Sequence, residues 1–172
     1  MRLIVALALI AAACSAAAPR GQDPSITADG RAIDGDTVSI DIRLSGVDSF
    51  EKRQLCRSKS GCWQCGRAAQ DYASRLLKYG SATIRLTGKQ SYGRPIGTVE
   101  VGVQDLGETM IAAGLALPAT SYLKAEPARA QRYVAAYEQA QRRQSGAHAG
   151  YFIDPAKWRQ GHRLACERSA RP

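Results

Sequence analysis

Histidine is scarce in this chain: only His148 and His162 occur among its 172 residues, both late in the sequence. Neither lies beside an acidic residue or a cysteine, so the pattern disfavours a two-histidine ribonuclease mechanism. The G-x-S-x-G elbow of serine hydrolases, the Walker phosphate loop and the dinucleotide fingerprint are absent as well. These absences leave acidic and basic side chains as the main candidates for chemistry.

Long hydrophobic runs are also lacking, apart from residues 3–13, which are too few to span a bilayer as a mature helix. A single arginine precedes this run, and three alanines at 16–18 offer an A-x-A cleavage site. We therefore expect residues 1–18 to be an export signal and the protein to be periplasmic or secreted. Cys14 is an alternative lipid-attachment site; otherwise no membrane segment is expected.

The mature chain is long enough for one domain. We expect a flexible leader over residues 19–25, the domain over residues 26–160, and a tail over residues 161–172 that is frayed except at Cys166.

Cysteine usage fits an exported protein. Without Cys14, four cysteines remain, and an even number in an oxidising compartment predicts two disulfides among Cys56, Cys62, Cys65 and Cys166. Three pairings are possible, and the sequence alone does not choose among them. A zinc site on the C-x-x-C pair would need a second close ligand pair, and a redox motif would need a βαβ pattern; neither is present.

The charge balance is strongly positive. The chain has 24 Lys and Arg against 15 Asp and Glu, a net charge of +9 and a pI near 9.6. Such an excess attracts polyanions, so nucleic acid or an anionic membrane surface is the natural partner. The alternative is that the charge serves only solubility.

Hydrophobic periodicity predicts an α+β protein. Segments 26–33, 37–44, 82–87 and 96–103 are rich in Val, Ile and Thr and are typical of strands. Apolar residues recur at helical spacing over 67–79, 106–113 and 127–144. This order favours a small, partly open barrel with helices packed around it.

Acidic and basic residues gather at the ends of these predicted strands, in segments 34–37, 43, 48–51 and 92–94. Phosphodiester hydrolysis needs a carboxylate to handle the attacking water and fixed cations for the transition-state charge. Arginine suits the second task because its planar fork meets phosphate bidentately.

At these positions the chain resembles the thermonuclease (staphylococcal-nuclease-like) family. The matching motifs are D-G-D-T-V at 34–38, R-L-x-x-V-D-S-x-E at 43–51 and Y-G-R at 92–94, with further likeness at 106–115, 151–152 and Trp158. The resemblance covers residues 26–159 and implies a five-stranded OB-fold barrel with about three helices. It also implies a monomeric, Ca²⁺-dependent nuclease that cuts DNA and RNA with little sequence specificity and leaves 3′-phosphates.

The resemblance further implies a role for each site residue. Carboxylates of Asp36 and Asp48 and the carbonyl of Ser49 would bind Ca²⁺, which prefers oxygen ligands. Glu51 would orient or deprotonate the attacking water. Contacts to the phosphate and the nucleotide are implied for Arg43, Arg94, Tyr92 and Tyr122.

The cysteine-bearing insertion at residues 56–65 resembles a loop of proteobacterial members of the family. In those members the cysteines that match Cys56 and Cys65 pair with each other. The resemblance therefore implies that Cys62 pairs with Cys166 in this chain. The sequence departs from the founding member at Gln90 and Ser91, which replace an aspartate and a lysine, and at Thr120, which replaces a tyrosine.

Only six residues separate Asp36 from Arg43, so a hairpin between the second and third strands would have to turn very tightly.

Two other functions are weighed against the nuclease: an OB-type nucleic-acid-binding module without catalysis, and an exported protein that binds anionic surfaces.

Overall fold

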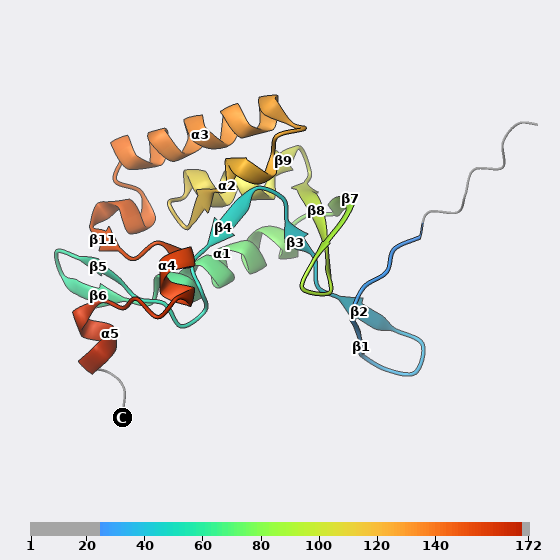
Figure 1. Ribbon diagram of the computed structural model, residues 1–172, viewed down its shortest axis with the longest axis horizontal. Coiled ribbons are helices and arrows are strands. Elements are labelled where there is room, and N and C mark those ends of the chain that lie inside the picture. Colours follow the sequence, from blue (N-terminus) through green and yellow to red (C-terminus); the bar gives the residue numbers. More distant parts are fainter. Residues whose placement is uncertain (1–24, 170–172) are drawn as a thin grey trace, which may run out of the picture.

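The computed structural model describes residues 25–169, and over that range the fold is α+β, as predicted (Figure 1). The strands are β1 Gly30–Ala32, β2 Val38–Ile40, β3 Arg43–Leu44, β4 Val47–Ser49, β5 Cys56–Ser58, β6 Gly61–Trp63, β7 Ala82–Ser91, β8 Arg94–Val101, β9 Gln104–Asp105, β10 Ala116–Pro118 and β11 Tyr151–Phe152. The α-helices are α1 Cys65–Lys78, α2 Leu106–Ala112, α3 Pro127–Arg142, α4 Pro155–Arg159 and α5 Ala165–Ser169; two 3₁₀ helices are η1 Thr120–Tyr122 and η2 Gly146–Ala149. The predicted signal and most of the leader lie outside the described residues.

The strands form four separate sheets in the described part of the chain. The largest has the order β3-β8-β7, with β9 also paired to β8; β7 and β8 are antiparallel, whereas β3 runs parallel to β8. The hairpin between β7 and β8 closes through Tyr92 and Gly93, whose φ angles are 50° and 72°. Positive φ at both central residues is the turn geometry that matches the natural twist of a hairpin.

The expected five-stranded barrel is not confirmed, because the strands of the described residues do not close on one another. The β1–β2 hairpin is a sheet of its own and stands away from the helical body (Figure 1). Its stem touches the β7–β8 turn, where the Asp29 amide donates to the Gly93 carbonyl at 3.0 Å. Because the β1–β2 hairpin does not pair with β7, β7 is an exposed edge strand. The side chain of Ile84 in β7 is 49% exposed, and that of Val38 in the hairpin is 74% exposed.

The predicted tight turn between the second and third strands is not needed. Strands β2 and β3 follow each other with only Asp41 and Ile42 between them, but they belong to different sheets. The chain therefore passes from one sheet to the next instead of reversing, which accommodates the short spacing between Asp36 and Arg43.

The main core lies where α2 packs against α3, α1 and β4 (Figure 1). Ile111, Leu123 and Tyr133 are almost completely buried there. Each such side chain contributes about 1.5–3 kcal/mol relative to an exposed position. The Tyr133 hydroxyl donates to Asp105 at 2.9 Å, and burial raises the pKa of that phenol.

A second, smaller core lies under the cysteine-bearing hairpin and contains Phe50, Cys56, Cys65 and Ala147. Two disulfides, Cys56–Cys65 and Cys62–Cys166, connect this region, and these are the pairings that the resemblance implies.

Over residues 161–168, the described part of the predicted tail, the chain is packed at Leu164 and Glu167 rather than frayed, in contrast to the expectation. Leu164 and Glu167 are buried, and the Glu167 carboxylate accepts hydrogen bonds from Leu55 N (2.9 Å), Trp158 Nε1 (2.7 Å) and Leu164 N (2.9 Å). A buried carboxylate is costly unless such donors satisfy it, and here they do. Of the helices in residues 25–169, none is both long and apolar enough to cross a bilayer.

Candidate functional site

The turn between β3 and β4 brings two predicted site residues together. Arg43 begins β3 and Asp48 lies in β4; the Arg43 guanidinium donates to Asp48 Oδ1 at 3.2 Å and to the Val47 carbonyl at 3.4 Å. Gly46 makes this turn possible, because its φ is 69° and a Cβ there would stand 2.4 Å from the buried Leu123 side chain. Glycine is the residue that takes this conformation without strain.

Glu51 follows β4 directly and is held by its neighbour Gln54. The Glu51 amide donates to the Gln54 side chain at 3.1 Å, and the Gln54 amide donates to the Glu51 carbonyl at 2.7 Å. Gln54 is fully buried, and its Nε2 donates to the Ile153 carbonyl at 2.6 Å. Gly66 of α1 approaches so closely that a Cβ would lie 1.7 Å from the Glu51 carbonyl oxygen. The backbone at Glu51 is therefore fixed from three sides.

Arg159, which the sequence did not single out, lies in the middle of these carboxylates. Its guanidinium donates to Asp48 Oδ1 at 3.0 Å, to Asp48 Oδ2 at 2.8 Å and to Glu51 Oε1 at 2.9 Å. Hydrogen bonding to Asp48, and then to Glu51, raises the pKa of Arg159 above its ordinary value. A lone arginine on a five-residue helix has no sequence pattern that would have indicated this contact.

Asp36 is not brought to this site. It lies in the loop of the β1–β2 hairpin, where Thr37 Oγ1 donates to its Oδ1 at 3.2 Å. The neighbouring Asp34 accepts from the Thr37 and Asp36 amides at 2.8 and 3.3 Å, and hydrogen bonds from Thr37 and Asp36 lower the pKa of Asp34. These bonds organise the loop locally.

The remaining predicted residues lie in β4, in β8, in the β7–β8 turn and in η1. Ser49 pairs with Ala116 of β10, and its hydroxyl donates to the Leu115 carbonyl at 3.0 Å. Arg94 begins β8 beside the β7–β8 turn. Tyr92 at the tip of that turn is 94% exposed, and Tyr122 in η1 is 79% exposed.

The carboxylates, as arranged, do not fit a Ca²⁺ site. Ca²⁺ takes six to eight oxygen ligands, and residues 25–169 contain no group of three or more His, Cys, Asp or Glu side chains that could hold a metal. Asp48 and Glu51 supply two carboxylates, but the cations of Arg43 and Arg159 already neutralise them.

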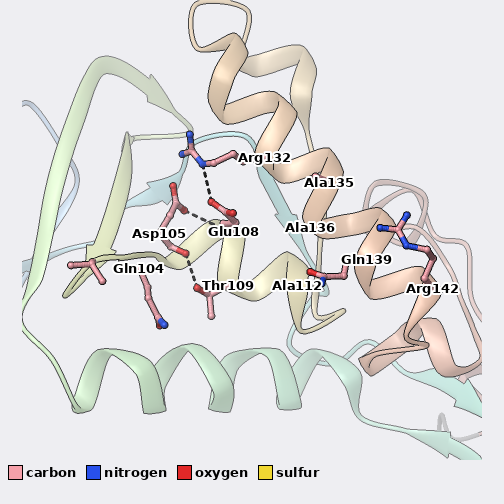
Figure 2. Close-up of a pocket in the computed structure, with 11 residues that line it drawn as sticks. Gln104, Asp105, Glu108, Thr109, Ala112, Arg132, Ala135, Ala136, Gln139 and Arg142 are labelled. Carbon is pink, nitrogen blue, oxygen red and sulfur yellow. Dashed lines mark hydrogen bonds and ion pairs between the residues drawn. The ribbon is translucent and has the colours of Figure 1, made fainter.

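A cleft of about 620 Å³ lies away from these residues, between β9, α2 and α3 (Figure 2). Figure 2 shows two of its charged groups engaged: Arg132 contacts Glu108 at 3.0 Å, and Asp105 caps α2 by accepting from the Glu108 amide at 3.0 Å. Asp105 also pairs with Arg129 of α3. None of the predicted site residues lines this cleft, and its polar groups serve to join α2 to α3.

The sequence was also compared with models of protein families and with curated proteins. The family model described as staphylococcal nuclease homologue matches residues 41–148, more than half of the chain. The chain belongs to this family. Its members are generally nucleases, and their domain is an OB-fold. Among curated proteins, no match was found.

The match to the staphylococcal nuclease homologues divides the site residues. Arg43, Asp48, Glu51 and Arg94 lie inside the matched range. Asp36 precedes it, and the whole C-terminal segment that carries Arg159 follows it. Four of the predicted site residues therefore lie within the family match, whereas Asp36 and Arg159 lie outside it.

Proposed function

We propose that the protein is an exported nuclease that hydrolyses phosphodiester bonds of DNA and RNA and leaves 3′-phosphates. The observation that carries the proposal is the meeting of Arg43, Asp48 and Glu51 at the end of β4, inside a domain whose relatives are generally nucleases. The net charge of +9 supports a polyanionic substrate, because it attracts nucleic acid with little regard to sequence.

In the proposed reaction, water attacks the phosphorus atom in line with the bond to the 5′ oxygen. The Glu51 carboxylate accepts a proton from that water, the phosphorus–oxygen bond breaks, and the leaving 5′ oxygen takes a proton from solvent. Arg43 and Arg94 bind the phosphate oxygens and stabilise the extra charge of the five-coordinate transition state. The rigid backbone around Glu51 supports its role, because a general base must hold a fixed position.

Tyr92 and Tyr122 are proposed to contact the nucleotide. Both rings are largely exposed, and an exposed aromatic face binds unpaired bases of any sequence by stacking. Tyr92 also adopts a φ of 50°, which costs a non-glycine residue about 1–2 kcal/mol.

Ca²⁺ dependence is proposed because the family's nucleases generally use this ion. The proposed ligands are Asp36, Asp48 and the Ser49 carbonyl, which the structure does not assemble.

A barrel closed by the β1–β2 hairpin belongs to the same proposal. Hairpin residue Val38 and β7 residue Ile84 both expose apolar surface, and mutual burial of that surface is favourable at about 25 cal/mol per Å².

Export is proposed through a signal at residues 1–18, with lipid attachment at Cys14 as the alternative to simple cleavage, and with a monomeric mature domain. The two disulfides support this, since such bonds persist in oxidising compartments.

The second candidate is a nucleic-acid-binding module without catalysis. It is favoured by one observation. The carboxylates of Asp48 and Glu51 are paired with Arg159, and the Asp36 carboxylate is not assembled with them into a metal-binding group in the described residues.

The test compares the oxidised mature chain with its Glu51→Gln variant on single-stranded DNA. The nuclease proposal expects similar DNA affinity but turnover reduced by about 10²- to 10⁴-fold, because only the general base is lost. Binding without turnover in both proteins would support the non-catalytic module. Equal turnover in both would refute the role of Glu51.

A further inference from the structure

We propose that a basic cleft between the segment after β4 and the start of α1 binds a backbone phosphate of the nucleic-acid strand, next to the phosphate that is cut. The basic cleft has a volume of about 320 Å³ and is lined by Lys52, Arg53, Leu55, Gln64 and Arg67. The inference rests on the proposed function in taking nucleic acid as the substrate and Glu51 as the neighbouring catalytic group.

The lining of the basic cleft carries more positive charge than the fold neutralises. Three of its five residues are cationic and none is acidic. Within the described part of the chain, the exposed side chains of Lys52 and Arg53 make no hydrogen bond or ion pair. Arg67 pairs with Asp71 at 3.2 Å, but these side chains are 58% and 50% exposed, so solvent screens the pair and a phosphate can replace it.

The types of side chain in the basic cleft indicate a phosphate. An arginine guanidinium meets two phosphate oxygens through parallel N–H donors, and a lysine ammonium adds a point charge. The net charge of +9 concentrates polyanions at the surface of the protein. Because the three cations are exposed, a continuous strand can reach them, and a nucleic-acid backbone supplies the phosphate in that form.

The bonds behind the basic cleft hold it in shape. Cys56 and Cys65 each follow a lining residue directly, and their disulfide joins the two sides of the cleft. The Gly66 amide of α1 donates to the Gln54 carbonyl at 3.2 Å, between the same two segments. The fold therefore brings the cations together before a ligand binds, which lowers the entropic cost of binding.

The basic cleft adjoins the proposed general base. Lys52 follows Glu51 directly, and Gly66 packs so closely on this segment that a Cβ would lie 1.7 Å from the Glu51 carbonyl oxygen. Every nucleotide of a strand carries a phosphate, so a strand with one phosphate at Glu51 has others beside it. A phosphate in the basic cleft would fix the position of the strand without reading its sequence, because backbone contacts carry no base information.

The experiment measures binding of a single-stranded oligonucleotide to the oxidised mature Glu51→Gln protein, the parent, in which the strand is expected to stay intact. The cleft variant adds Lys52→Gln and Arg53→Gln to the parent. The control adds Arg75→Gln and Lys78→Gln, which remove two exposed cations from the last turn of α1. A helical rise of about 1.5 Å per residue puts them at least about 12 Å along the axis from the cleft end of α1, beyond a Debye length of about 8 Å.

The cleft variant should bind the oligonucleotide about fivefold more weakly than the parent, the effect of two exposed ion pairs, and the control less than about twofold. Loss of one phosphate contact should also reduce the slope of log affinity against log salt concentration by about 0.7. Equal changes in the cleft variant and the control would show that only net charge matters, and would overturn the inference.

Oligonucleotides in which each phosphate in turn is replaced by a neutral methylphosphonate identify the contact. One replacement beside the cut position should weaken binding to the parent about fivefold and leave binding to the cleft variant unchanged, because its partner is already lost. The same loss in both proteins at every position would contradict a phosphate in the cleft. Calorimetric titration with inorganic phosphate tests the free ion: binding that the cleft variant loses, with DNA affinity unchanged, would overturn the assignment to a strand.

Nuclease activity of the chain that retains Glu51 separates the two proposals. Weaker DNA binding by the cleft variant, with the control unaffected, supports the phosphate site even if that chain does not cut DNA, an outcome that would sink only the catalytic proposal. Cleavage of DNA together with equal affinities of the cleft variant and the control would leave the nuclease standing and overturn the basic cleft. Absence of DNA binding in every protein overturns the cleft as well.

Discussion

Gly46→Ala is the substitution for which the structure gives the clearest expected magnitude. Gly46 has a φ of 69°, and an alanine forced into this left-handed region loses about 1–2 kcal/mol. The new methyl group would also lie 2.4 Å from Leu123, which is 1% exposed and has no room to move aside. Overpacking of a core by one carbon costs about 1–3 kcal/mol. The two effects together should lower the free energy of unfolding by about 2–5 kcal/mol. That is a large share of the total free energy of unfolding of a typical protein, about 5–15 kcal/mol.

Gly102→Ala is the matched control for this prediction. Gly102 has a similar φ of 61°, but no atom lies within 4 Å of the position that its Cβ would take. It should therefore show the backbone cost alone, about 1–2 kcal/mol. Urea unfolding of the oxidised proteins at one pH measures both values, provided the m-value is unchanged.

The clash with Leu123 is isolated by a double-mutant cycle. In a Leu123→Ala background, Gly46→Ala should cost about as much as Gly102→Ala, because the methyl group then fills vacated space. Equal losses for Gly46→Ala and Gly102→Ala in the intact background would refute the claim that Leu123 dictates glycine at this turn. The same turn brings Arg43 to Asp48, so nuclease activity of Gly46→Ala should fall as well.

Two further predictions concern the exposed ring at the β7–β8 turn and the half-buried His148 beside the smaller core. Tyr92→Ala should weaken binding of single-stranded DNA by about 1–3 kcal/mol. The control Tyr79→Ala removes another exposed ring, at the end of α1, and should not weaken it. Fluorescence titration that finds equal losses for the two variants would rule out base stacking by Tyr92. Burial lowers the pKa of His148, whose ring lies 5.0 and 5.5 Å from those of Tyr137 and Phe152. The unfolded chain therefore binds a proton more readily, so stability is full above about pH 6.5 and declines as the pH falls through that value. Urea unfolding from pH 8 to 5 should show a shallower decline for His148→Asn, and identical slopes would exclude His148 as a cause.

The parts of the fold that follow local rules were predictable. Apolar spacing predicted a helix over 67–79, and α1 spans Cys65–Lys78; the Pro127 start of α3 was also predicted. The end of α3 was placed at 144 instead of Arg142, because no glycine or proline marks the stop. Both disulfides agree with the pairing that the family resemblance implies.

Features that depend on tertiary placement were not predictable. Arg43 and Asp48 meet because a short turn joins their strands, a contact that the sequence analysis did not predict although it assigned both residues to one site. Asp36 was expected beside Asp48, but its position depends on where the β1–β2 hairpin packs against the rest of the protein. No local sequence pattern predicts that packing. The contact from Arg159 joins residues 111 and 108 positions apart, far beyond the reach of any periodicity.

The central claim is tested most directly by incubating the purified, oxidised mature chain with single-stranded DNA, with Ca²⁺ and with a chelator, and by analysing the product ends. The account predicts cleavage with Ca²⁺, none with the chelator, and products that carry 3′-phosphates. Intact DNA under both conditions, in a protein that still binds it, would contradict the assignment of a nuclease.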